Sequence, residues 1–113
     1  MPSLFTRVMK GEIPGTLVYE DNQCAAFLDI EPEAPKHFLV VPRKEIKSLN
    51  EATIEDEALL GHLMLVAAQV AREQGFSAKG YRIAINIGAH GGQSVDHLHV
   101  HVLGGRQMGW PPG

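Results

Sequence analysis

Several features that would mark a particular class of protein are scarce in this chain of 113 residues. It has a single cysteine, Cys24, which excludes an internal disulfide and suits a reducing compartment. It has no basic surplus, since 10 Lys and Arg stand against 13 Asp and Glu, so we expect no nucleic-acid partner. The segment from Met1 to Gly15 contains no apolar run of signal-peptide length, and the composition suggests no membrane span. A cytoplasmic protein is therefore the default expectation.

What is present is ordinary for a folded domain. The chain is 44% hydrophobic and 20% charged, with a formal net charge of −3. Its length suffices for one domain with one core, and it shows no internal repeat and no linker. We therefore expect a single domain over residues 1–113.

The hydrophobic pattern predicts short strands on both sides of one long helix. Ser3 is expected to cap a short N-terminal helix that Gly11 and Pro14 end. A long helix is predicted with Thr53 as its N-cap and Gly75 as its C′ residue, and with one apolar face between them. Strands are predicted over residues 16–19, 24–30, 37–41, 81–87 and 97–103. This order indicates an α+β fold with an antiparallel sheet.

Three histidines that alternate with aliphatic residues form the most distinctive pattern, from His97 to Leu103. Alternate residues of a strand lie on opposite faces, so we expect one imidazole face and one apolar face. Buried imidazoles need polar partners, and three of them on one face therefore favour chemistry over packing.

Strand geometry limits the metal ions that these histidines could hold. The Cα atoms of His97 and His101 would lie roughly 13 Å apart along a strand, whereas zinc needs ligand nitrogens at about 2.0–2.1 Å. One ion bound by all three rings is therefore disfavoured. A pair such as His97 and His99 with a ligand from another strand stays open, although no cysteine pair supports it.

Nucleophilic catalysis fits the alternating histidines better. Neutral imidazole is a good nucleophile at pH 7, because the ordinary histidine pKa is about 6.5. The loop before the histidines, residues 88–94, is rich in glycine, and Gln93 and Ser94 add hydrogen-bond donors suited to a phosphate. It is not a Walker loop, since no Gly-Lys-Ser/Thr follows and no helix begins there.

The stretch from Gln93 to Leu103 resembles the His-φ-His-φ-His-φ-φ signature of the histidine triad (HIT) superfamily. Residues 11–14, 27–30, 34–42 and 60–64 resemble the same family. The ending from Gly104 to Gly113 resembles the Hint branch, the histidine triad nucleotide-binding proteins. The resemblance implies the HIT-like fold, with about five antiparallel strands, one long helix and a short N-terminal helix, and it implies a homodimer.

The resemblance also implies a function. It predicts a purine nucleoside phosphoramidase that hydrolyses the P–N bond of AMP-amine type conjugates through a nucleotidyl-histidine intermediate. No cofactor or catalytic metal is implied, and the partner is a purine nucleotide, as an AMP or GMP conjugate. Ser3 and Thr6 occupy positions where some relatives have a zinc-binding Cys-x-x-Cys, so structural zinc is not expected. A nucleotide-binding regulatory protein with weak catalysis, a dinucleoside polyphosphate hydrolase and a zinc-binding module stay open as alternatives.

The family's functional residues carry over position by position. His99 is the implied nucleophile, and His97 and His101 would orient it and contact the phosphate. His37 resembles a histidine behind the triad that completes a proton relay, although core packing would explain it equally well. Asp29 would bind the ribose hydroxyls as an acceptor-only carboxylate, whereas its position alone favours an Asx-turn. The other implied nucleotide contacts are Phe5, Ile13, Phe27 and Ile30 around the base, and Asn86, Gly92, Gln93 and Ser94 on the phosphate side.

Overall fold

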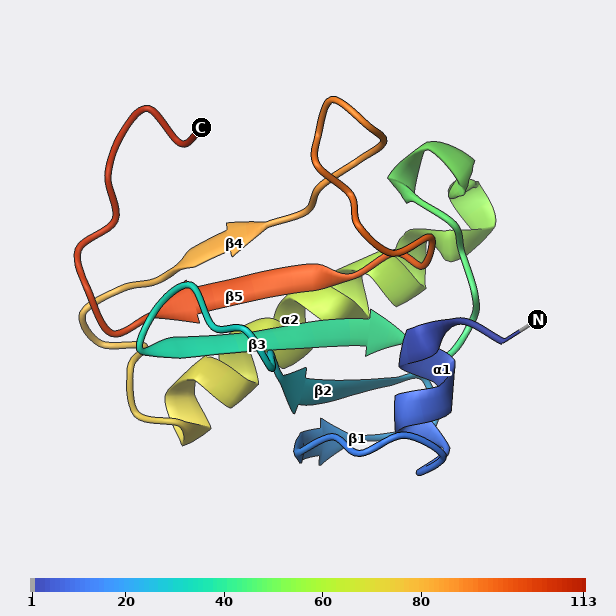
Figure 1. Ribbon diagram of the computed structural model, residues 1–113, viewed down its shortest axis with the longest axis horizontal. Coiled ribbons are helices and arrows are strands. Elements are labelled where there is room, and N and C mark those ends of the chain that lie inside the picture. Colours follow the sequence, from blue (N-terminus) through green and yellow to red (C-terminus); the bar gives the residue numbers. More distant parts are fainter. Residues whose placement is uncertain (1) are drawn as a thin grey trace.

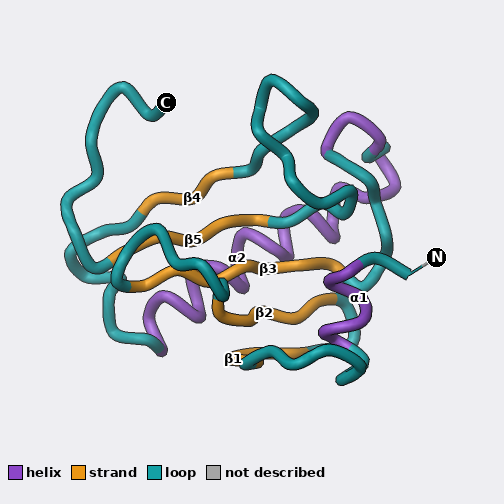
Figure 2. Tube along the Cα trace, viewed as in Figure 1, coloured by secondary structure: helices purple, strands orange, loops and turns teal. Residues whose placement is uncertain are grey.

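A five-stranded antiparallel sheet forms the centre of the structure, a computed structural model that describes residues 2–113 (Figure 1). The strands are β1 (Leu17–Glu20), β2 (Cys24–Leu28), β3 (Lys36–Pro42), β4 (Arg82–Ala84) and β5 (Val100–Gly104), in the order β1-β2-β3-β5-β4. The long helix α2 (Glu57–Glu73) covers one face, and the short helix α1 (Leu4–Met9) lies against the other (Figures 1 and 2). The expected α+β fold is confirmed.

Alternation along the strands divides the buried side chains between two cores. The larger core packs the sheet against α2, and it includes Leu98, Val100 and Val102 from the histidine stretch. The smaller core packs α1 against the opposite face, through Phe5, Met9, Ala25, Phe27, Leu39 and Val41. The apolar side chains between the histidines therefore face α2, which leaves the imidazoles on the side of α1.

The histidine stretch is a strand over only part of its length. β5 begins at Val100, so the strand expected over residues 97–103 is wrong for residues 97–99. Val100 pairs with Val40 near the end of β3, and Pro42 ends that strand because it has no N–H to continue the ladder. Strand β4 is also shorter than the expected residues 81–87, because its pairing with β5 stops at Ala84.

The long helix begins later than its capping signal. Thr53 caps a 3-10 turn, Ile54–Asp56, through a capping box, and α2 itself starts at Glu57. Gly75 follows the end of α2 with φ of +82°, as the sequence predicts for a C′ glycine. No helix among residues 2–113 has the length and apolar character needed to cross a bilayer.

One carboxylate ties the turn between β1 and β2 to α2. Asp21 Oδ1 accepts the backbone N–H groups of Gln23 (2.7 Å) and Cys24 (2.8 Å). Asp21 Oδ2 accepts from the Tyr19 hydroxyl (2.7 Å) and from His62 Nε2 (2.6 Å) on α2. Burial by itself would raise the pKa of Asp21, but these four hydrogen bonds outweigh burial and hold the pKa well below the ordinary 3.8.

Asp21→Asn should therefore destabilise the fold at neutral pH, by about 1–3 kcal/mol, because an amide cannot accept from all four donors. A lowered folded-state pKa gives stability that is present above the unfolded pKa, near 3.8, and is lost as pH falls through the folded value. The difference between wild type and variant in free energy of unfolding, measured with urea, should thus shrink below about pH 4. Glu20→Gln, in the exposed pair with Arg43, is the matched control and should change little. A difference that stays constant into strong acid would contradict this role of Asp21.

Candidate active site

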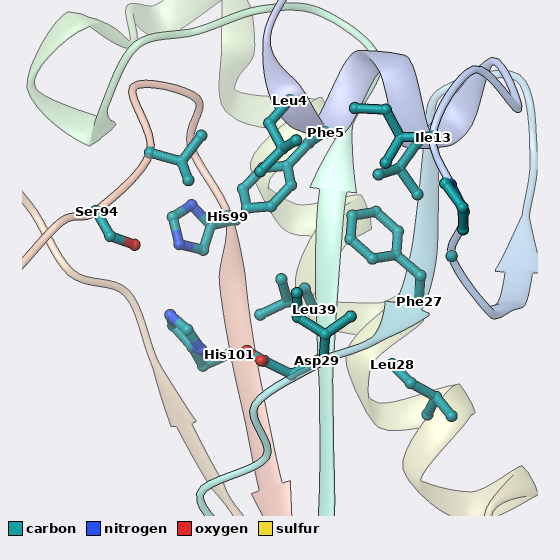
Figure 3. Close-up of a pocket in the computed structure, with 15 residues that line it drawn as sticks. Leu4, Phe5, Ile13, Phe27, Leu28, Asp29, Leu39, Ser94, His99 and His101 are labelled. Carbon is teal, nitrogen blue, oxygen red and sulfur yellow. The ribbon is translucent and has the colours of Figure 1, made fainter.

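A cavity of about 240 Å³ lies between α1 and the face of the sheet opposite α2 (Figure 3). Its walls are mostly apolar and come from α1, from the segment before β1, and from β2 and β3. Its polar groups are Asp29, Ser94, His99 and His101, and Figure 3 shows the two imidazoles side by side at one end. An apolar pocket with a few convergent polar groups is the usual form of a small-molecule site.

The cavity gathers many of the side chains expected around a nucleotide. Those that line it are Phe5, Ile13, Phe27, Asp29, Ile30, Ser94, His99 and His101. Asn86, Gly92 and Gln93 do not line it. Seven further residues of the wall were not predicted from the sequence, namely Leu4, Val8, Pro14, Gly15, Leu28, Leu39 and Val95. Nothing in an apolar pattern distinguishes such residues from ordinary core, because both are selected for burial.

The glycine-rich loop uses several of its donors internally. The Gln93 side-chain amide donates to the carbonyl oxygens of Lys47 (2.7 Å) and Val95 (2.9 Å), and its oxygen accepts the N–H of Gly88 (3.1 Å). The backbone N–H groups of residues 92 and 93 donate to carbonyl groups in the same loop. The expected convergence of these donors on a phosphate is therefore not seen, and Ser94 is the loop residue that reaches the cavity.

The His99 ring is held in one tautomer. Its Nδ1 lies 2.7 Å from the backbone oxygen of His97, and a carbonyl can only accept, so Nδ1 carries the proton. Nε2 then holds the free lone pair on a ring that lines the cavity. Phe5 packs edge-to-face on this ring, with 4.8 Å between centroids. Burial lowers the pKa of His99 below the ordinary 6.5, which keeps the ring neutral.

The His101 ring takes the opposite tautomer. The backbone N–H of Glu33 donates to Nδ1 of His37 (3.0 Å), so the proton of His37 is on Nε2. That Nε2 lies 2.9 Å from Nδ1 of His101 and donates to it, which places the His101 proton on Nε2. Burial, together with the nearby rings of His99 and His37, lowers the pKa of His101 to about 4.

Asp29 combines a turn with a place in the cavity. Its Oδ1 accepts the N–H of Glu31 at 2.8 Å, which is the Asx-turn that its position predicts. Its Oδ2 lies 3.4 Å from Nε2 of His37, and Figure 3 shows the carboxylate beside His101. The turn thus fixes Asp29 while one carboxylate oxygen stays on the side of the cavity.

His97 lies behind the site rather than in it. Its ring is fully buried, with Nε2 2.8 Å from the carbonyl oxygen of Pro42 and Nδ1 2.5 Å from Oγ of Ser3. This contradicts the expectation that the His97 ring contacts a phosphate, because both nitrogens are already hydrogen-bonded within the protein. The backbone oxygen of His97, and not its ring, reaches the His99 ring.

The pairing of His97 with His99 around a metal ion is also contradicted, since both ring nitrogens of His97 are engaged. Within residues 2–113, potential metal ligands converge to within 4.8 Å in two other groups: Asp29, His37 and His101, and Asp21, Cys24 and His62. Hydrogen bonds already join members of each group. At the positions of the Cys-x-x-Cys, Ser3 and Thr6 offer hydroxyls, which are not among the usual zinc ligands, so these residues do not fit a zinc ion.

Comparison with known proteins places this arrangement in a class. The model of the HIT domain matches residues 10–108. An uncharacterized HIT-like protein of Synechococcus elongatus is 50% identical over 111 residues, which cover 98% of this chain and 96% of that protein. The crystal structure of a HIT family hydrolase from Legionella pneumophila Philadelphia 1 is 46% identical, with a TM-score of 0.96 and coverage of 99% of this chain and 100% of that one. A histidine triad protein from Clostridium difficile is 42% identical, with a TM-score of 0.91 and coverage of 94% and 92%.

Fold and site together define a small α+β protein with alternating histidines beside an apolar pocket. The chain belongs to the HIT family.

The ring protons of the triad can be tested directly by ¹⁵N imidazole NMR. At pH 7 we expect His99 to be neutral with its proton on Nδ1, and His97 and His101 to be neutral with their protons on Nε2. Titration should give pKa values below 6.5 for all three, because burial disfavours the charged rings. A sample unfolded in urea, with averaged tautomers, is the control. A His99 proton on Nε2 would remove the geometric basis for an attacking nitrogen.

Proposed function

We propose that this protein is a purine nucleoside phosphoramidase, which hydrolyses the P–N bond of AMP-amine and GMP-amine conjugates. The observation that carries the proposal is the His99 tautomer, with Nδ1–H bound to a backbone carbonyl and the Nε2 lone pair on a ring that lines the apolar cavity of about 240 Å³. The name of the Legionella relative, a HIT family hydrolase, supports hydrolytic chemistry.

The first step is attack by His99 Nε2 on the α-phosphorus, which forms an N–P bond and breaks the P–N bond to the amine. The attacking ring becomes cationic, and the backbone oxygen of His97 at Nδ1 stabilises that charge. The departing nitrogen takes a proton from an imidazole, and His101 is placed for this role beside His99 with His37 behind it. A bound anionic phosphate favours the protonated form of His101 relative to the empty site.

The second step restores the enzyme. A water molecule attacks the phosphorus of nucleotidyl-His99, forming an O–P bond as the bond from phosphorus to Nε2 breaks. The water loses one proton, which an imidazole of the His37–His101 pair accepts. The products are the nucleoside monophosphate and neutral His99, so the atoms and protons of the two steps balance without a metal or a cofactor.

The cavity supports a nucleoside as the bound half of the substrate. Phe5 and Phe27, with 5.6 Å between ring centroids, offer apolar surface for a flat base. Asp29 offers an acceptor for the two ribose hydroxyls. Ser94 stands at the histidine end, where the phosphate would lie, and the roles of Asn86, Gly92 and Gln93 there remain predictions.

We also propose that two chains pair, as the family resemblance implies. β4 is an edge strand, and the side chains of Leu65 and Trp110 are 72% and 81% exposed. An unpaired sheet edge and exposed large apolar side chains are features that a second chain would cover.

His99→Ala should lower kcat for an adenosine phosphoramidate by roughly 10³-fold or more, because the covalent route is lost. Nucleotide binding, measured by calorimetry with AMP, should stay detectable. Wild-type enzyme quenched in acid should yield a protein mass increased by one nucleotidyl group, and the Ala variant should not. An active His99→Ala protein would exclude His99 as the nucleophile.

A steady-state screen of the wild-type protein against two classes of nucleotide substrate identifies the leaving group. Adenosine and guanosine phosphoramidates should have a higher kcat/KM than dinucleoside polyphosphates, with AMP or GMP as the product. The opposite order would favour a dinucleoside polyphosphate hydrolase. If the protein binds nucleotides but hydrolyses neither phosphoramidates nor dinucleoside polyphosphates, the result would favour a nucleotide-binding regulatory protein.

Asp29→Asn should raise KM for the ribonucleotide substrate and reduce kcat/KM by roughly 10- to 100-fold, since hydrogen bonds to a charged acceptor contribute about 1.5–3 kcal/mol. The matched substrate is the 2′,3′-dideoxy phosphoramidate, which has no hydroxyls to bind. The wild type and the variant should hydrolyse it at similar rates. Equal losses on both substrates would show that Asp29 does not act through the ribose.

A further inference from the structure

Ser3 joins the start of helix α1 to the buried ring of His97. Its Oγ accepts the backbone N–H of Thr6 at 3.0 Å, which is the N-cap bond of α1. The same Oγ lies 2.5 Å from Nδ1 of His97. Its backbone N–H donates to Oε1 of Glu45, also at 2.5 Å, in the segment between β3 and α2. Three parts of the chain that are distant in sequence therefore meet at Ser3.

The direction of each hydrogen bond follows from the available protons. Nε2 of His97 donates to the Pro42 carbonyl, so Nδ1 is an acceptor and needs a donor. The Ser3 hydroxyl has one proton to give, and Nδ1 receives it. The Ser3 backbone N–H lowers the pKa of Glu45, so this carboxylate is ionised at neutral pH, with Oε1 4.0 Å from Nδ1.

The hydrogen bonds of Ser3 affect the position of the His99 ring in two ways. The first passes through His97, whose ring is fixed at both nitrogens and whose backbone oxygen holds Nδ1 of His99 at 2.7 Å. The second passes along α1, because Phe5 lies two residues after Ser3 and packs edge-to-face on the His99 ring. A change at Ser3 therefore displaces both the hydrogen-bond acceptor and the aromatic neighbour of His99.

We propose that Ser3 and Glu45 are positioning residues for His99, acting through the ring of His97 and through the docking of α1. Helix α1 is then part of the machinery that aims the nucleophile, as well as a wall of the pocket. The kinetic consequence rests on the proposed function, whereas the effect on the imidazole tautomers does not. Small displacements of an attacking atom cost large factors in rate, so the expected loss is in kcat.

Ser3→Asp separates helix capping from proton donation. Aspartate is as good an N-cap as serine, but at neutral pH it has no proton to give to Nδ1. We expect a melting temperature close to that of the wild type, a kcat lower by roughly 10- to 100-fold, and a KM within about twofold. In ¹⁵N spectra the proton of His97 should move to Nδ1. Ser3→Thr, which caps and donates, should restore both kcat and the Nε2 tautomer.

Glu45→Ala tests the second residue. Loss of the acceptor for the Ser3 N–H should lower kcat in the same direction as Ser3→Asp, by a smaller factor of roughly 3- to 10-fold. Glu55→Ala is the matched control, since Glu55 is an exposed glutamate that, like Glu45, precedes α2 in the sequence. The kcat of this variant should equal that of the wild type.

Two results would overturn the positioning role. One is a Ser3→Asp protein with wild-type kcat and an unchanged His97 tautomer. The other is a raised KM with unchanged kcat, which would make α1 a pocket wall only. If wild-type protein does not hydrolyse phosphoramidates, the proposed function fails, and the His97 and His99 tautomers of the Ser3 variants then decide the positioning role by themselves.

Discussion

A buried imidazole needs a hydrogen-bond partner for its ring nitrogens, and much of the structure around the triad meets this requirement. His97 uses both nitrogens within the protein, on Pro42 and Ser3. His99 uses one nitrogen on the backbone of His97, and His101 uses one on His37. Each of the latter two rings keeps Nε2 on the side of the cavity, one as an acceptor and one as a donor. The hydrogen bond at Nδ1 of each of these two rings thus decides whether its Nε2 accepts or donates a proton.

The two faces of the sheet make this arrangement possible, because one face is packed in the core and the other carries the imidazoles. Leu98, Val100 and Val102 are buried against α2, and this apolar contact holds the histidine stretch in place. The opposite face is covered by the short helix α1 and the segment before β1, and the cavity lies there beside the imidazoles. Rigid packing on one face therefore supports reactive groups on the other.

Local patterns predicted most of the fold but not where pairing stops. The N-cap bond of Ser3, the positive φ of Gly75 and the apolar stripe of α2 depend on residues close by in the sequence, so they could be predicted from it. The ends of β4 and β5 depend on what the neighbouring strand offers, and Pro42 on β3 ends the ladder before His99. The sequence of the glycine loop suggested free donors, but the side-chain amide of Gln93 donates to the backbone carbonyl groups of Lys47 and Val95. Such competition between internal and ligand hydrogen bonds is invisible before the chain is folded.

The sequence by itself indicated that the three imidazoles would lie opposite the apolar side chains that alternate with them, because a period of two separates the faces of a strand, although only His101 lies within β5. It also determined the family, through residues spread over most of its length. Only the tertiary structure decided what each imidazole does. Glu33, Ser3 and Pro42 lie between 4 and 94 residues from the rings of His37 and His97 that they contact, and these contacts decide which nitrogen of those two rings carries the proton. A tautomer is a property of three-dimensional neighbours, so no spacing of histidines in the sequence can specify it.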